Sequence, residues 1–84
     1  MAYKLEKLIS PAHYISHRCV KAYVCDTEDD VDNLPKVGVA GTQILNDGED
    51  YFNNEECNYG SEATVVEPFS GYKLNASNEW KKVF

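Results

Sequence analysis

The segment Gly60–Val83 constrains the fold most, because it alternates short β-type runs with turn residues. Val65 and Val66 are β-branched and stiff at χ1, which suits a pleated strand. Pro68 fixes φ for a turn that follows this strand, and Gly71 can supply a positive φ at the end of that turn. The pattern therefore predicts a strand followed by a tight reversal of the chain.

The second half of this segment predicts two further strands. Tyr72 and Leu74 are two residues apart, so they share one face of the second strand. Asn75 and Asn78 mark a second turn, and the third strand contains Trp80. The result is a three-stranded meander without a recognisable chemical group, which is typical of a structural or binding module.

Upstream of the meander, the pattern is less specific. Residues 3–9 fit both a helical face and an alternating strand, and Pro11 ends the segment in either case. From Tyr14 to Cys25 the composition predicts a half-buried strand. One face would carry Val20, Ala22 and Val24, and the other Cys19, Lys21, Tyr23 and Cys25.

Residues 27–33 predict a short helix. Thr27 is a good N-cap, and Asp30 three residues later forms a weak version of the capping box. The acids of the first turn are favoured by the helix dipole, which explains this acidic run better than a ligand site. Val31 and Leu34 would face the core.

Residues 42–52 predict a β-hairpin, since Asp47-Gly48 is a preferred pair for a two-residue type I′ turn. Residues 53–58 are polar and predict a loop. We therefore expect residues 1–84 to form a single domain of mainly β class. It would be a small antiparallel β module of hairpins and a C-terminal meander with one or two short helices, with an α+β arrangement as the alternative.

The motifs of the meander resemble a module of small tailed-bacteriophage virion proteins, of the head-fibre or capsid-decoration type. The resemblance rests on the Gly60-Ser61 strand start, on Tyr72-x-Leu74-Asn75, and on Glu79-Trp80-Lys81. Upstream, Tyr23–Thr27 followed by Leu34-Pro35 is similar to the start of the same module. This chain departs from the pattern by an insertion, Lys36 to Tyr59, between the two blocks.

The resemblance implies a non-enzymatic bacteriophage structural protein that acts through protein–protein contacts. Such a protein is made in the bacterial host cytoplasm and ends in the virion. Its partners would be copies of itself, with a trimer favoured, or phage capsid and fibre proteins. Tyr72, Leu74 and Trp80 are the candidates for packing between subunits, and burial in the chain's own core explains them equally well.

The negative charge is concentrated in the middle of the chain. Residues 26–62 carry eleven acids and Lys36, which gives −10, while the whole chain carries −6. Such a field disfavours nucleic-acid backbones and anionic membranes as partners. The alternative function is therefore a small acidic phage-encoded inhibitor that mimics DNA and binds a host nucleic-acid-binding or defence protein. A solvated acidic face explains the same charge without a partner.

The candidate chemical groups do not form a convincing site. Three cysteines leave at least one thiol unpaired, which fits a reducing cytoplasm. His13, His17, Cys19 and Cys25 are a weak zinc candidate, because ligands four residues apart on a strand lie roughly 13 Å from one another. Residues 46–50 faintly suggest calcium, but a hairpin turn explains them. We expect no cofactor, no metal and no enzymatic activity.

Overall fold

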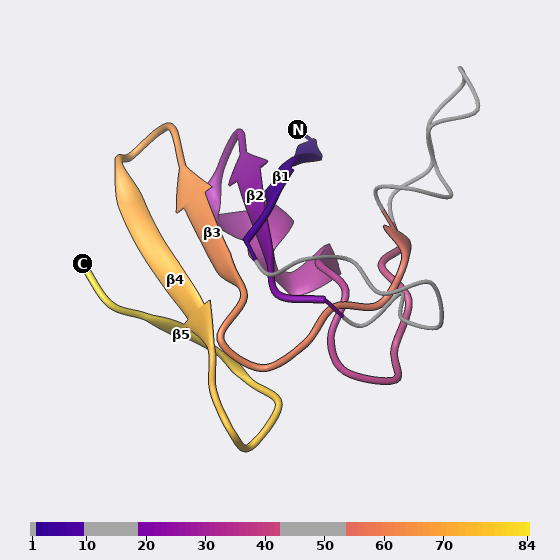
Figure 1. Cartoon of the computed structure of the whole chain (residues 1–84). Helices are drawn as coiled ribbons and strands as arrows, with labels where there is room; N and C mark the ends of the chain where they lie inside the picture. The colour runs from indigo at the N-terminus through magenta and orange to yellow at the C-terminus, as the bar shows by residue number, and fades with distance from the viewer. Residues whose placement is uncertain (1, 10–18, 43–53) are drawn as a thin grey trace.

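A single five-stranded sheet organises the computed structural model, which describes residues 2–9, 19–42 and 54–84 (Figure 1). Within this described part, one short helix, η1, follows the second strand, and the protein is mainly β as predicted. The strands lie side by side in chain order. The elements are β1 (Tyr3–Leu8), β2 (Lys21–Cys25), η1 (Glu28–Asn33), β3 (Glu62–Val65), β4 (Ser70–Leu74) and β5 (Trp80–Lys82).

The sheet is mixed rather than purely antiparallel. Three neighbouring pairs are antiparallel, as expected from the sequence, but β2 and β3 run parallel. Parallel neighbours need a long crossover connection, and residues 26–61 provide it, beginning with η1. The expectation of an antiparallel module thus does not hold for this pair, because a hairpin signal exists only between strands that are close in sequence.

The predicted C-terminal meander is confirmed in β3, β4 and β5. Its second reversal uses the predicted asparagines: Asn78 has a φ of 63°, and its N–H donates to the Asn75 carbonyl at 2.9 Å. The first reversal spans residues 66–69. Gly71 was expected in that turn but lies inside β4, without a left-handed φ.

The sequence of residues 3–9 fits both a helix and a strand, and in the structure this segment contains the strand β1. Tyr3 and Leu5 face the core, and they alternate with exposed residues. A bulge between Leu5 and Lys7 shifts the register of β1 against β2. The prediction of a half-buried β2 was wrong, because four of its five residues are buried. Its interior side is the one that carries Tyr23 and Cys25, since η1 packs there.

The helix η1 begins as the sequence predicts. The Thr27 N–H donates to the Asp30 carboxylate at 3.0 Å, which satisfies one of the N–H groups at the start of the helix. Val31 and Leu34 are both buried, as predicted for the core-facing side. Pro35 follows at once and ends the helix.

The core lies between the sheet and the connection that contains η1, which Figure 1 shows behind β2 and β3. Tyr23 is its largest fully buried residue, and its ring makes edge-on contacts with Tyr3 and Trp80, at centroid distances of 6.1 and 6.2 Å. Such contacts stabilise by about 0.5–1.5 kcal/mol each beyond simple burial. The core cluster consists of Tyr3, Tyr23, Cys25, Val31, Leu34, Cys57, Ala63, Val65 and Leu74.

One side chain of the meander binds the connection at residue 37. Asn78 accepts a hydrogen bond from the Val37 N–H at 3.0 Å and donates one to the Val37 carbonyl at 3.1 Å. Its amide therefore imitates a backbone partner for residue 37.

Three predictions from the sequence concern residues that lie outside the described part of the chain. The predicted hairpin at 42–52 and the calcium candidate at 46–50 lie almost entirely outside the described residues, as do His13 and His17. Within the described part of the chain, the structure has no helix long and apolar enough to span a membrane.

Candidate functional site

The strand register separates two faces of the sheet. The face toward η1 is covered by the core, whereas the opposite face, here called the open face, carries charged and exposed side chains. Residues that are paired across neighbouring strands project to the same side of the sheet, so the register identifies the residues of the open face. They are Lys4, Lys7, Ala22, Val24, Glu62, Thr64, Gly71, Lys73 and Lys81.

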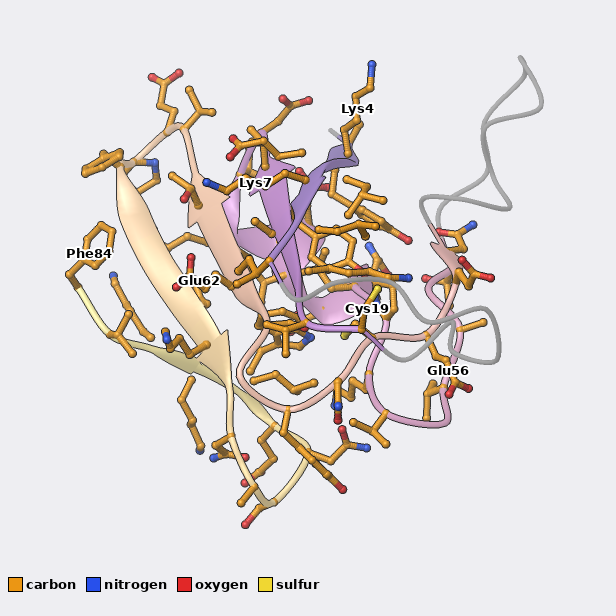
Figure 2. The ribbon with its side chains drawn as sticks, viewed as in Figure 1. Lys4, Lys7, Cys19, Glu56, Glu62 and Phe84 are labelled. Carbon is orange, nitrogen blue, oxygen red and sulfur yellow. The ribbon has the colours of Figure 1, made fainter. Side chains whose placement is uncertain are left out.

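The open face is basic although the chain is acidic. Among the residues that the register places on this face, four lysines stand against Glu62, a net charge of +3, and Glu6 lies between Lys4 and Lys7 at the bulge of β1. Glu62 pairs with Lys73 at 3.4 Å, while Lys4 and Lys7 have no ion-pair partner among the described residues. Figure 2 views this face and labels Lys4, Lys7 and Glu62 on it. The face therefore keeps two cations available for an external partner.

An exposed apolar patch lies at the β4 edge of the open face, formed by Phe69, Val83 and Phe84, and β2 and β3 separate it from Lys4 and Lys7 on β1. The two aromatic rings are in contact, with centroids 5.4 Å apart. Phe69 is 72% exposed, Phe84 61% and Val83 56%. Exposed apolar side chains that form a patch mark contact surfaces more often than single exposed apolar side chains do.

Gly71 explains why the Phe84 ring reaches the open face. A Cβ built on Gly71 would lie 2.2 Å from the ring, so only glycine leaves room for it. The backbone holds the ring in place, because the Val83 N–H donates to the Gly71 carbonyl at 2.7 Å and the Gly71 N–H donates to the Phe84 carbonyl at 3.0 Å. These bonds continue the β4–β5 ladder past the end of β5.

A shallow hollow of about 100 Å³ adjoins the ring. Thr64, Gly71 and Lys73 form part of its lining, together with the apolar Val83 and Phe84. This volume suits one inserted side chain rather than a substrate, since ligand pockets usually enclose about 300–1,000 Å³. The geometry therefore favours contact with a macromolecule.

A polar cluster on the covered side positions η1 against the meander. The Glu28 carboxylate accepts hydrogen bonds from the Tyr72 hydroxyl at 2.8 Å and the Ser70 hydroxyl at 3.3 Å, and it pairs with Lys82 at 3.0 Å. The bond to Lys82, followed by that from Tyr72, lowers the pKa of Glu28. Desolvation and the nearby carboxylate raise the pKa of Tyr72. The cluster is a structural fastening rather than a pair of groups poised for acid–base exchange.

The three residues predicted to pack between subunits lie on the covered side. Leu74 is 1% exposed and belongs to the core of a single chain. Tyr72 and Trp80 are half-buried and pack against that core, and the Trp80 indole donates to the Pro35 carbonyl at 3.1 Å. Their contacts within one chain match the alternative interpretation.

The sequence reasoning did not single out Phe69 or Phe84. A phenylalanine inside a Pro-Phe-Ser turn was the available signal, because phenylalanine is more often buried than placed in an exposed turn. The position of Phe84 over Gly71 depends on the β4–β5 register, which no local pattern reveals.

The cysteines are poor candidates for nucleophiles or metal ligands. All three thiols are free and buried. Burial, with the charge of Asp30 as a second cause, raises the pKa of the Cys25 thiol to about 12, and burial also raises the pKa of Cys57. Because the thiolate is the reactive and ligating form, these groups are held in their unreactive state. The described residues contain no group of three His, Cys, Asp or Glu side chains that could hold a metal ion.

One buried cation is neutralised within the chain. Lys21 is 2% exposed, its ammonium group donates to the Glu56 carbonyl at 2.9 Å, and Glu55 lies 3.7 Å away. The pair fastens β2 to the segment that precedes β3. It offers no open side to a ligand.

Comparison of the chain with protein-family models, curated proteins and solved structures found no match.

Proposed function

We propose that this chain is a small non-enzymatic structural protein of a tailed-bacteriophage virion, of the head-fibre or capsid-decoration type, which acts through protein–protein contacts. The observation that carries the proposal is the exposed Phe69–Phe84 pair beside an open sheet face. The resemblance of the Gly60–Val83 motifs supports the virion role, and the patch supports an adhesive mechanism.

The patch has the composition of an interface anchor. Aromatic side chains supply a large contact area with few rotatable bonds, and a polar rim excludes water around them. Here the rim contains Lys73, which is exposed and pairs with Glu62. Leaving two phenylalanine rings in water costs hydrophobic free energy, and burial against a partner recovers about 25 cal/mol per Å² of apolar surface.

The DNA-mimic alternative has less support among the described acids. Asp30 is buried and caps its own helix, and Glu28 is occupied by Lys82, Tyr72 and Ser70. Mimicry needs carboxylates that are spaced like phosphates and free to meet a basic groove. Two of the five acids at positions 26–32 therefore do not meet that need.

The test is mass spectrometry of virions purified from the phage that encodes this chain. We expect the chain in wild-type particles and its loss from particles that carry Phe69→Ser. Tyr59→Ser is the matched control, since Tyr59 is an exposed aromatic residue outside the patch. Absence of the chain from wild-type particles would reject the virion role. Equal incorporation of both variants would reject the patch as the contact.

A further inference from the structure

The two sides of this molecule carry opposite charge. On the open face, Lys4 and Lys7 have no ion-pair partner among the described residues. On the other side of the sheet, η1 presents Asp29 and Asp32 as exposed carboxylates, also without an ion-pair partner in the described part of the chain. Figure 1 shows η1 behind the sheet, opposite the face that Figure 2 displays with its lysines.

From this arrangement we propose that copies of the chain associate head to tail, with the open face of one copy against the outer side of η1 of the next. The inference rests on the proposed function as a protein-contact module and names its first partner, a second copy. Contact between copies in this direction brings Lys4 and Lys7 toward Asp29 and Asp32. A contact that extends across the open face to β4 also covers the apolar patch, whose area would supply affinity while the charges supply orientation.

The charges argue against the symmetric alternative. A two-fold dimer formed by two open faces would place lysines opposite lysines, which is destabilising. Contact between two η1 surfaces would place aspartates together in the same way. A head-to-tail contact uses two different surfaces, so it generates a closed ring when the rotation between copies closes and a filament when it does not.

The association is tested by exchanging the charges. Lys4→Glu with Lys7→Glu makes both surfaces acidic, and Asp29→Lys with Asp32→Lys makes both basic. We expect each double variant to self-associate at least about tenfold more weakly than the unmodified chain in sedimentation experiments at low salt. An equimolar mixture of the two should associate again, because each copy then meets an oppositely charged surface on both sides.

A fourfold variant that carries all four substitutions reverses both surfaces in one chain, and it should associate by itself. The control is Ser77→Glu, which changes the charge at the exposed turn between β4 and β5 and should leave association within about twofold of the unmodified chain. Circular dichroism should show every variant folded, since the substituted side chains are exposed.

Three results would overturn the head-to-tail contact. They are a monomeric unmodified chain at every concentration, unchanged association of the Lys4→Glu, Lys7→Glu variant, and failure of both the mixture and the fourfold variant to associate. These results are independent of the virion test, because a chain that is monomeric in solution can still be found in particles. Conversely, a head-to-tail assembly that is absent from virions would reject the virion role alone.

Discussion

Single residues decide how this small sheet presents its surface, and Gly71 is the clearest case. It lies in the middle of β4, where glycine is ordinarily unfavourable, and its missing side chain makes room for the Phe84 ring. The residue was expected in a turn because glycine is common there. Its role instead depends on a ring that approaches from a neighbouring strand.

Gly71→Ala should therefore destabilise the chain by about 1 kcal/mol, because the Phe84 ring must leave its position. In a Phe84→Ala background the same change should be neutral or stabilise by up to about 1 kcal/mol, since alanine is favoured over glycine in a strand. Urea unfolding of the four chains measures both values. Equal effects of Gly71→Ala in the two backgrounds would show that the ring does not pack on residue 71.

The cysteines provide a second prediction at this scale. Because burial keeps Cys25 and Cys57 protonated, with the pKa of Cys25 at about 12, the native thiols should resist alkylation at pH 8. Denatured protein should expose all three thiols to the same reagent, and a reductant should leave the native circular dichroism unchanged. Rapid labelling of Cys25 in the folded chain would contradict its buried position.

At the scale of elements, the sequence was most informative where its signals were local. The meander, its Asn75–Asn78 reversal and the cap of η1 each depend on residues within a few positions of one another. The parallel pairing of β2 and β3 and the position of Phe84 depend on contacts across the sheet, for which alternation and turn residues carry no information. Periodicity correctly placed Tyr72 and Leu74 on one face of a strand, but it indicated neither the partner strands nor the burial of four of the five residues of β2.

The junction of η1 and the meander predicts a pH dependence. The pKa of Glu28 is lower in the folded chain than in the unfolded chain, because Lys82 and Tyr72 stabilise its charged form. Its stabilising contribution is therefore present above the unfolded pKa and is lost as the pH falls through the folded pKa. Glu28→Gln should destabilise at pH 7, and the difference from the unmodified chain should shrink as the pH falls below about 4. A difference that stays constant over this range would contradict the ion pair.

The two hydrogen bonds between Asn78 and Val37 give a further prediction, and two different substitutions of Asn78 separate their contribution from that of the backbone conformation. Asn78→Gly keeps the left-handed backbone accessible and removes both hydrogen bonds to residue 37, so it should cost about 1–3 kcal/mol. Asn78→Ala also imposes an unfavourable φ and should cost about 1–2 kcal/mol more. Thermal unfolding followed by circular dichroism separates the two contributions. Asn78→Gly that is as stable as the unmodified chain would show that the amide bonds are dispensable.

For the whole molecule, the proposed contact with a partner depends on the difference between the two sides of the sheet. The covered side supplies the core, and it contains Leu74 together with the half-buried Tyr72 and Trp80 that were first considered as contact residues. The open side carries the apolar patch and four lysines, of which Lys4 and Lys7 have no ion-pair partner among the described residues. A chain of 84 residues gains little stability from its core alone, so we expect the proposed partner on the open side to stabilise the folded chain further.

Light scattering at micromolar concentration measures the mass of the chain in solution. This mass tests directly whether the chain associates with a second copy through the open side. We predict an assembly larger than the 9.5 kDa monomer for the unmodified chain, and a shift toward the monomer for Phe69→Ser but not for Tyr59→Ser. A single species near 9.5 kDa for all three chains would contradict the claim that the open side associates with a second copy.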